Sequence, residues 1–386
     1  MTARARQVRR VSYVTVAKVP GERAHSIQIA KTCEALARRL DEVELVVPRL
    51  GARAAHVPPP RGVRLVRLLA PNFLPLGRWW PGWLMRLLFD VQSIAFARLA
   101  LVRALVRRRS DAYYTRSPFV AFVFSFIFGS RVVLELHVPP ASAARRLLLR
   151  ICWLFGCRCV AISDALRQQV AKVLRVTADE IGVAHDGYDP ALFTSLPDRG
   201  ETRKRLGLAD DAFVMCYVGS AETLGGAKGV HLIAEAFRQA SVPGAVLLLV
   251  GVEADASVSQ AAGVRCLGRV SPGQVAAVLG VCDCALMSFP DEPGYARAMS
   301  PLKLLEYLAA GLPIIAPDLL NLREVLDESC ALFTPLGDAA ALAECMRRLG
   351  SDAALRARLA ASSAERAPAY TWDARAERLI VFLRSR

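Results

Sequence analysis

With 386 residues, 54% of them hydrophobic, the chain is long enough for two domains with sizeable cores and too apolar to be intrinsically disordered. Its net charge of +15 is uneven: residues 1–196 contain 30 Lys and Arg against 13 Asp and Glu, whereas residues 197–386 contain 20 against 22. An arginine-rich proteome would explain part of the excess but not this asymmetry. We therefore expect no nucleic-acid partner, but an anionic partner of the first half, such as a membrane surface, a lipid diphosphate or an acidic glycan.

The apolar segments are too short to cross a membrane. The longest uncharged apolar run, Phe119 to Phe128, has ten residues, whereas a span needs about 20. The ten cysteines show no metal-site spacing, and such unpatterned cysteines fit a reducing compartment. We expect a cytoplasmic protein without a transmembrane helix or a metal site, able to bind peripherally at the inner face of a membrane.

In chain order, the first half alternates apolar strand patterns with helical patterns, which predicts a parallel sheet covered on both faces. Residues 25–40 have the apolar period of a helix, and Ser163-Asp164 opens another that runs to about Leu174. The predicted strands are 11–16, 43–47, 63–69, 111–116, 131–136 and 159–162.

An unusual segment, Pro71 to Pro81, lies within this half. It is rich in proline and leads into a cluster of tryptophans and arginines. Aromatic residues mixed with arginines ahead of an apolar helix suit a membrane interface or an apolar acceptor. The alternative is a loop whose tryptophans pack into the core. The residues concerned are Arg78, Trp79, Trp80, Trp83 and Arg86.

The second half repeats the alternation, so the sequence predicts an α/β chain with two doubly wound, Rossmann-like domains facing one another across a cleft. We place the first domain at residues 1–190, the second at 191–369, and a terminal helix that packs back toward the first domain at 370–386. The predicted strands of the second domain are 213–218, 245–250, 264–267, 285–287, 313–316 and 330–333.

A glycine-rich turn follows the first strand of the second domain. Gly219 comes directly after the strand, where glycine lets the backbone approach a ligand, and Lys228 would add a positive charge for a phosphate. The spacing is not that of a Walker loop. Taken alone, the turn reads better as a long glycine turn with an exposed lysine, but together with the helix start near Ser300 it favours a nucleotide diphosphate.

The stretch from Met299 to Asp318 reads as a helix aimed at an anion. Ser300 is predicted as its N-cap and Pro301 as its first helical residue. Lys303 in the first turn opposes the helix dipole, and a bound phosphate would account for it. Glu306 lies deeper, where a carboxylate can accept hydrogen bonds from sugar hydroxyls. Gly311 is placed to end the helix.

The motif from Ser300 to Pro313, with Leu322-Arg323-Glu324-Val325, resembles the nucleotide-sugar glycosyltransferases of family 4, which have the GT-B fold and retain the anomeric configuration. Supporting similarities lie in Val218-Gly219-Ser220 with Lys228-Gly229, in Glu135-Leu136-His137, in Ala184 to Asp189 and in Tyr370 to Arg375. The resemblance implies that the glutamate at 306 holds the nucleotide ribose and that the helix start receives the donor diphosphate. The donor-binding residues it implies are Gly219, Ser220, Lys228, Ser300, Pro301, Lys303 and Glu306.

Two positions depart from the family pattern. Ser220 stands where the family often has an arginine, so one cationic contact to the diphosphate is missing unless Lys303 replaces it. Ala298 stands where a second glutamate usually contacts the sugar. That leaves backbone amides near Ala298–Ser300, or Asp291 and Glu292, to hold the sugar.

In the first domain, the resemblance implies that His137 contacts the donor sugar near the reacting carbon, and we take it as the catalytic candidate. A lone histidine is otherwise more often structural. Gly21 and His25 occupy the first strand-to-helix turn, where the family places a contact to the donor or acceptor. The polar stretch from Val183-Ala184 to Arg205 is the predicted hinge between the two domains; His185 and Asp186 lie in it and suggest a structural lock.

The expected reaction is transfer of a hexose, with retention, from a UDP- or GDP-sugar to a hydroxyl of a glycan or a lipid-linked acceptor. No metal or other cofactor is expected, because no Asp-x-Asp signature follows a strand and cationic groups can stabilise the leaving diphosphate. The alternatives are a nucleotide-sugar epimerase of the same fold and a non-catalytic membrane-surface protein.

Overall fold

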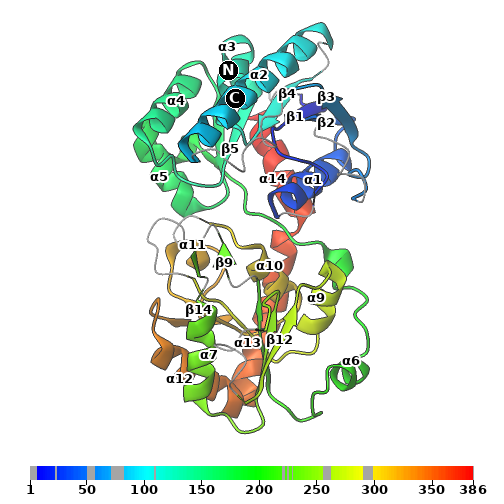
Figure 1. Cartoon of the computed structure of the whole chain (residues 1–386), viewed down its shortest axis with the longest axis vertical. Coiled ribbons are helices and arrows are strands. Elements are labelled where there is room, and N and C mark those ends of the chain that lie inside the picture. The colour runs from blue at the N-terminus through cyan, green and yellow to red at the C-terminus, as the bar shows by residue number, and fades with distance from the viewer. Residues whose placement is uncertain are drawn as a thin grey trace, which may run out of the picture. The chain divides into compact units, whose positions relative to one another are not determined.

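The computed structural model divides into two compact units, shown in Figure 1. Unit 1 consists of Met1–His185 and Trp372–Arg386, and unit 2 of Asp186–Thr371. The sequence-based boundaries, at 190/191 and 369/370, lie within a few residues of these divisions. The described residues are 7–21, 24–49, 57–70, 82–107, 110–219, 222–223, 226–227, 229–254, 262–289 and 299–385.

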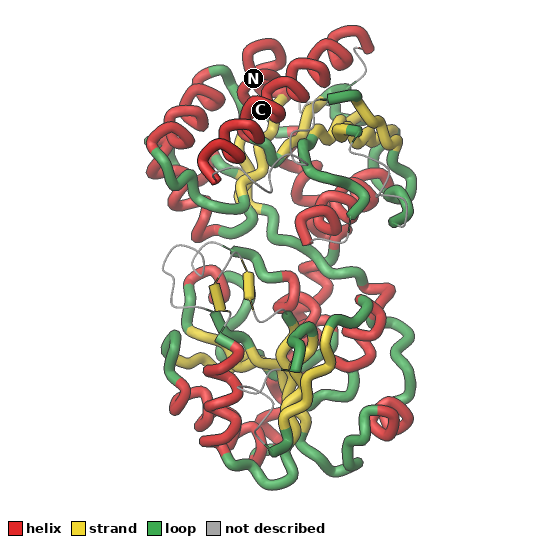
Figure 2. Tube along the Cα trace, in the orientation of Figure 1, coloured by secondary structure: helices red, strands yellow, loops and turns green. Residues whose placement is uncertain are grey.

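Unit 1 is built on a parallel sheet in the order β3-β2-β1-β4-β5-β6-β7. The chain moves outward from β1 to β3, then returns to β4 and continues in the other direction. Figure 2 shows the strands in yellow. The strands are β1 Arg10–Val14, β2 Glu42–Pro48, β3 Arg64–Leu68, β4 Ala112–Thr115, β5 Val132–Leu136, β6 Arg158–Ala161 and β7 Gly182–Val183.

Helices cover both faces of this sheet. Right-handed crossovers place α1 on one face, and α2, α3 and α4, which follow the reversal of strand order, on the other. The terminal helix α14 packs on α1, while α2 packs on α3 and α3 on α4. The helices are α1 Ala24–Ala37, α2 Gly82–Arg107, α3 Pro118–Phe128, α4 Ala143–Leu154, α5 Asp164–Leu174 and α14 Trp372–Arg384, with short 3₁₀ turns at Gly129–Arg131 and Ala178–Glu180.

Unit 2 contains a second parallel sheet, in the order β12-β11-β8-β13-β14-β15, and a small antiparallel pair, β9 and β10. Here the chain moves outward from β8 to β12 and returns to β13. The strands are β8 Val214–Val218, β9 Glu222–Thr223, β10 Gly226–Ala227, β11 Val246–Val250, β12 Val264–Gly268, β13 Cys284–Leu286, β14 Ile314–Pro317 and β15 Ala331–Thr334.

The central strands of unit 2, β8, β11, β13 and β14, are apolar because both faces of the sheet are covered. Val214 and Cys216 of β8 lie in one buried cluster, and Met215 and Tyr217 lie in another. The helices are α6 Arg199–Arg205, α7 Val230–Ala240, α9 Pro272–Leu279, α10 Leu302–Ala309, α11 Leu320–Arg323, α12 Ala339–Ser351 and α13 Ala353–Arg366, with 3₁₀ turns at Pro190–Leu192 and Ala367–Tyr370.

Candidate functional site

The candidate site of unit 2 lies at the carboxyl ends of β8 and β13. The order of the strands reverses between these two neighbours, and such switch points are where open parallel sheets bind ligands. Gly219 follows β8, Ser288 lies two residues after the end of β13, and the start of α10 lies close to Gly219. Three separate segments of the chain therefore meet at one edge of the sheet.

Gly219 and Lys303, two of the predicted donor-binding residues, lie next to each other at this edge. Gly219 has φ 143°, a conformation that favours glycine, and a Cβ there would lie 3.2 Å from Lys303 Nζ. Lys303 Nζ also sits 3.9 Å from the centre of the Tyr217 ring, a cation–π contact that holds the ammonium over the strand end. Ser220 and Lys228, the other predicted members of this turn, lie outside the described residues.

Helix α10 starts later than predicted. Pro301 is its N-cap, without a side-chain capping bond, and Leu302 is its first residue, so the assignments of Ser300 as N-cap and Pro301 as first helical residue are wrong. The Ser300 hydroxyl instead accepts a hydrogen bond, 3.2 Å long, from the Asp186 amide. The helix does end at Gly311, which has φ 64°, as predicted.

Tyr307 fixes α10 to the ends of both central strands. Its hydroxyl accepts a hydrogen bond from the Val218 amide at 2.8 Å and donates one to the Leu286 carbonyl at 3.3 Å. Because Tyr307 is fully buried, these bonds set the position of the helix relative to the switch point. The sequence analysis quoted Tyr307 in the motif but gave it no role.

Glu306 is half-buried, and its surroundings favour the neutral acid. Burial raises the pKa of its carboxyl to about 7, although the positive charge of Lys303 opposes the shift. The residue therefore titrates near neutral pH, which is typical of a group that meets a ligand. Lys303 and Glu306 lie on the first two turns of α10 and interact electrostatically.

One residue of this edge, Ser288, was missed by the sequence analysis. Ser288 is buried, and its hydroxyl has no hydrogen-bond partner among the described residues. It lies against Gly229, the N-cap of α7, where an added Cβ would overlap the Ser288 oxygen. The free amides of a helix start and an unsatisfied hydroxyl together favour an anionic group. The sequence offered one signal for Ser288: it is a polar residue just beyond a predicted parallel strand.

Unit 1 carries its own cluster at the carboxyl end of β5. Glu135 is buried and accepts hydrogen bonds from the Tyr114 hydroxyl at 2.5 Å and from His137 Nε2. The fully buried Arg375 of α14 forms an ion pair with the same carboxylate at 2.8 Å. Burial alone would raise the pKa of Glu135, but Arg375 and His137 outweigh it and hold the pKa well below its usual range. His137 thus has a charged partner on its own strand.

Arg375 also joins this cluster to the end of the first chain segment of unit 1. Its guanidinium donates to the Ala184 carbonyl and, at 2.8 Å, to the His185 carbonyl. The His185 ring contributes little positive charge, because burial and the cations Arg378 and Arg375 lower its pKa to about 4. Arg375 was quoted in the family motif, but the sequence could not show that it reaches Glu135.

Gly21 and His25 lie beside the switch point of unit 1, between β1 and β4. A Cβ at Gly21 would approach the Lys18 carbonyl to 3.0 Å and Ser26 Oγ to 3.1 Å, so the tight turn leaves no room for a side chain. Arg116, which directly follows β4, donates to the His25 carbonyl at 3.4 Å and to Gln28 at 3.0 Å. The structure thus adds a cation that the sequence analysis did not select.

The described residues contain no group of three or more His, Cys, Asp or Glu side chains arranged to hold a metal ion. Asp291, Glu292 and Ala298, which the sequence analysis considered for the sugar site, lie outside the described residues.

Comparison with known proteins identifies a family match in unit 2 and structural neighbours of the whole fold. Residues 212–352 match the family described as Glycosyl transferases group 1. The phosphatidyl-myo-inositol mannosyltransferase of Mycobacterium leprae is 30% identical over 239 residues, which cover 57% of each chain. The D-inositol 3-phosphate glycosyltransferase of Stackebrandtia nassauensis is 30% identical over 250 residues, covering 57% of this chain and 54% of the relative. The chain thus matches a little over half the length of these relatives.

Solved structures match along the whole chain. The Anabaena protein HepE in complex with UDP superposes with a TM-score of 0.72 at 16% identity, covering 97% of this chain and 99% of that one. The sucrose-phosphate synthase of Thermosynechococcus elongatus gives 0.74 at 19% identity, covering 97% and 98%. The two parallel α/β units have the GT-B fold, which confirms the predicted fold class.

Proposed function

We propose that this chain is a glycosyltransferase that moves a hexose from a nucleotide-diphosphate sugar to an acceptor hydroxyl. The observation that carries the proposal is the approach of Lys303 Nζ to Gly219 at the switch point of unit 2, beside the start of α10. A lysine, a strand-end glycine and a helix start together suit a diphosphate. The family match over residues 212–352 lies on the same unit and supports the assignment.

The donor in this proposal is a UDP- or GDP-sugar. UDP is the first choice, because the HepE structures contain UDP and UDP-glucose. Ser288 and the start of α7 would add neutral donors to the phosphate oxygens, and Lys228 a second cation. Ionised Glu306 would accept hydrogen bonds from hydroxyls of the nucleotide ribose.

The reaction breaks the bond between the anomeric carbon and the diphosphate oxygen and forms a bond to the acceptor oxygen. The diphosphate gains negative charge as it leaves, so fixed cations and amides aimed at it stabilise the transition state without a metal being required. We propose retention by attack on the same face of the sugar, with the acceptor proton passing to the departing oxygen. His137, held by Glu135, would contact the sugar near the reacting carbon.

The acceptor is proposed to be a glycan or a lipid-linked hydroxyl compound. The two named relatives act on phosphatidyl-myo-inositol and on D-inositol 3-phosphate, so inositol compounds are the first to test. Both carry a phosphate, which would suit the basic unit 1.

The test is incubation with a panel of UDP- and GDP-sugars and inositol acceptors, followed by mass analysis and by NMR of the anomeric proton. A product heavier by one hexose, with the anomeric configuration of the donor, supports the proposal. A changed sugar still attached to nucleotide would identify an epimerase. If no donor is bound or consumed by the whole panel, the transferase assignment is wrong.

A further inference from the structure

Helix α2 exposes many of its large apolar side chains. The residues it buries are Phe96 and a set of small or polar residues, namely Gln92, Ser93, Ala97, Ala100 and Ala104. Its exposed side chains include Trp83 at 66% and Val106 at 77%. The other large apolar residues exposed on α2 are Leu87, Phe89, Val91, Leu99, Val102 and Leu105.

The apolar surface continues over the neighbouring helices. Helix α3 packs on α2 and exposes Phe126 and Ile127, and α4 packs on α3 and exposes Leu147 and Leu154. The ring of Phe126 stacks at 4.0 Å on Phe155, which is itself 44% exposed. Helices α2, α3 and α4 therefore form one continuous face, which we call the α2–α4 face. Such a patch far exceeds scattered single exposed residues and indicates an interaction surface.

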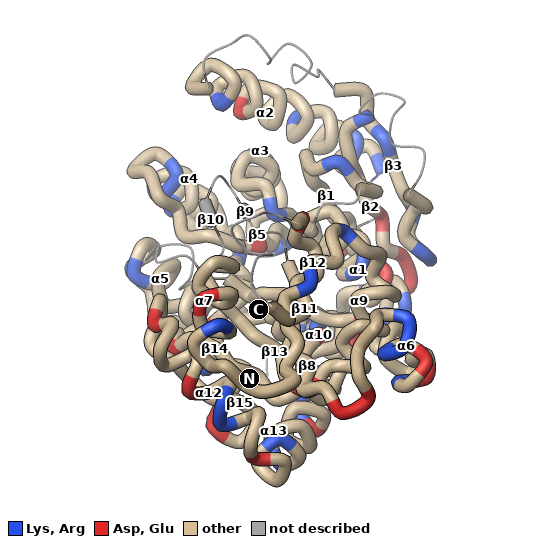
Figure 3. The backbone as a smooth tube through the Cα atoms, turned by 60° about the horizontal axis from the view of Figure 1, so that its bottom comes forward, with Lys and Arg blue, Asp and Glu red and all other residues tan. Residues whose placement is uncertain are grey.

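The same face is strongly basic. The three helices contain seven arginines and a single acidic residue, Asp90. Figure 3 marks these charges along α2 and α4. Over the whole chain, unit 1 contains 34 Lys and Arg against 13 Asp and Glu, whereas unit 2 contains 16 against 22. Of the seven arginines of the three helices, Arg86, Arg98, Arg107 and Arg145 are exposed, Arg146 and Arg150 are partly buried, and Arg103 points toward the sheet.

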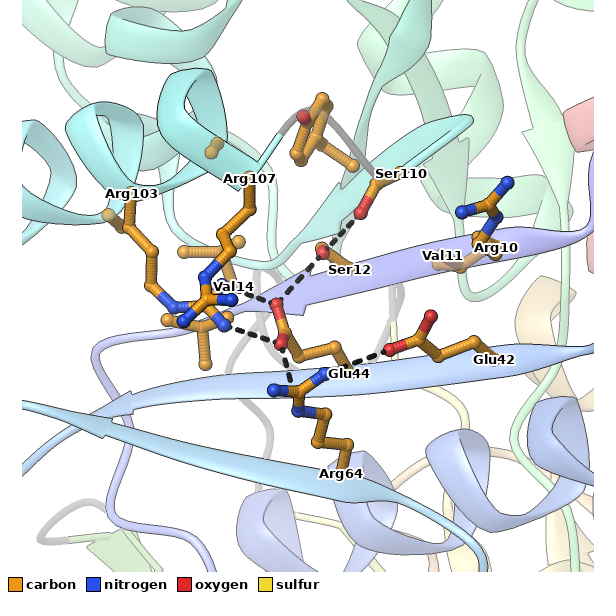
Figure 4. Close-up of a pocket in the computed structure, with 14 residues that line it drawn as sticks. Arg10, Val11, Ser12, Val14, Glu42, Glu44, Arg64, Arg103, Arg107 and Ser110 are labelled. Carbon is orange, nitrogen blue, oxygen red and sulfur yellow. Dashed lines mark hydrogen bonds and ion pairs between the residues drawn. The ribbon is translucent and has the colours of Figure 1, made fainter.

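The orientation of α2 is fixed from inside. Arg103 points toward the sheet and holds Glu44 of β2 through two bonds of 2.6 Å, and Glu44 also lies 3.7 Å from Arg64 (Figure 4). This half-enclosed cluster lines a cavity of about 20 Å³. Because this contact holds the inner side of α2 against the sheet, the helix cannot rotate to bury its apolar outer side.

We propose that the α2–α4 face of unit 1 docks on the surface of an anionic lipid bilayer. Apolar side chains would enter the boundary between headgroups and acyl chains, and the arginines would meet the lipid phosphates. No helix among the described residues is long and apolar enough to cross a bilayer, so the face lies on the membrane rather than spanning it. The sequence suggested membrane contact near Trp79, Trp80 and Trp83, and the α2–α4 face is the surface that we assign to it. Of these tryptophans, only Trp83 lies among the described residues.

The positive charge of the α2–α4 face favours an anionic bilayer, rather than a second copy of the chain, as its partner. Two copies joined through this face by a two-fold axis would bring arginine-rich helices against each other, and like charges across an interface are costly. An anionic bilayer supplies both an apolar interior and negative charge. The proposal rests only on unit 1 and does not require the transferase activity.

The test is co-sedimentation of the full chain with vesicles of phosphatidylcholine, alone or mixed with phosphatidylglycerol. We expect binding only to the mixed vesicles, weakened by added salt because screening shortens the range of the charges. Val106→Ser and Leu154→Ser should each lower binding several-fold. Arg98→Ala should lower it about five-fold, since one basic residue near such a surface is worth about 1 kcal/mol.

The matched control is Val381→Ser. Val381 is 70% exposed, similar to Val106, and lies in the same unit on α14, which packs on α1 rather than on α2. It should leave binding unchanged. The proposal is wrong if the chain ignores anionic vesicles or if Val381→Ser weakens binding as much as Val106→Ser. It is also wrong if light scattering shows a dimer that Val106→Ser dissociates, because a second copy then covers the face. Consumption of donor in solution is a separate readout, so the two proposals fail independently.

Discussion

Glu306 gives the candidate donor site a built-in pH dependence. Its pKa is raised from 4.5 to about 7, mainly by burial, so the carboxylate forms only as the pH rises through neutrality. A group that must accept hydrogen bonds from hydroxyls works best when ionised. Donor affinity should therefore increase as the pH rises through about 7, and Glu306→Gln should remove that step. Isothermal titration with UDP across this range measures it; an unchanged step in the variant would exclude Glu306 as its source.

The same carboxyl predicts the opposite trend for stability. A raised pKa means that the folded state binds more protons than the unfolded state between pH 4.5 and about 7, so the free energy of unfolding falls as the pH rises through this window. A shift of this size corresponds to at most about 3 kcal/mol. Urea unfolding above pH 7 should show Glu306→Gln to be more stable than the wild type. The control is Glu365→Gln, which replaces an exposed glutamate on α13 and should not raise the stability.

His137 looks isolated in the sequence, but in the structure it belongs to a charged cluster. Glu135 holds His137, and Arg375 neutralises Glu135, so in the proposed function Arg375 would act as a positioning residue at a distance from the sugar. Arg375→Lys keeps the charge but loses the planar fork that also binds the 184 and 185 carbonyls. We expect kcat to fall by up to about a hundred-fold while the affinity for UDP, bound in unit 2, stays unchanged.

The comparison of Arg375→Lys with Arg375→Met separates position from charge. Methionine leaves a buried carboxylate without its main cation, which costs roughly 3–5 kcal/mol. We therefore expect a lowered melting temperature for Arg375→Met and a smaller change for Arg375→Lys. Full activity in Arg375→Lys would contradict a positioning role.

At the scale of elements, Tyr307 ties α10 to two central strands of the unit 2 sheet. Tyr307→Phe removes both hydrogen bonds of a buried hydroxyl and leaves the Val218 amide unsatisfied, which costs about 1–3 kcal/mol. Because the bonds join α10 to β8 and β13, affinity for the donor diphosphate should fall together with stability. Urea unfolding and UDP titration measure the two effects. Tyr370→Phe, which removes one 3.4 Å bond to the Glu324 carbonyl, should have a smaller effect on both.

The elements themselves were largely predictable, because buried parallel strands are continuous apolar runs and helices have an apolar period. The start of α10 was not. Ser300 and Pro301 have the local chemistry of an N-cap and a first helical residue, but the Ser300 hydroxyl is occupied by the amide of Asp186, 114 residues earlier. Local sequence cannot show such a competitor. Ser288 and Arg116 were missed for a related reason: a single polar residue after a strand becomes a site residue only when strand order places it at the switch point.

At the scale of the whole molecule, unit 1 is assembled from two distant pieces of chain, and this arrangement predicts the effect of a truncation. Helix α14 supplies the buried side chains of Arg375, Leu379 and Leu383 to unit 1, whereas unit 2 is the continuous segment Asp186–Thr371. Removing the residues after Thr371 would uncover the apolar face of α1 and leave Glu135 without its main cation, a loss above about 3 kcal/mol from the charge alone.

We therefore expect the truncated chain to lose amide protection in β4, β5 and β6 of unit 1 while β8, β11 and β13 of unit 2 stay protected. Hydrogen exchange read by mass spectrometry resolves the two sheets in one experiment. UDP should still bind, since Gly219, Lys303 and Glu306 all belong to unit 2, but transfer should be abolished because His137 belongs to unit 1. Equal loss of protection in both sheets would show that the two units fold as one cooperative body, and loss of UDP binding with unit 2 intact would move the donor site away from the β8–β13 edge.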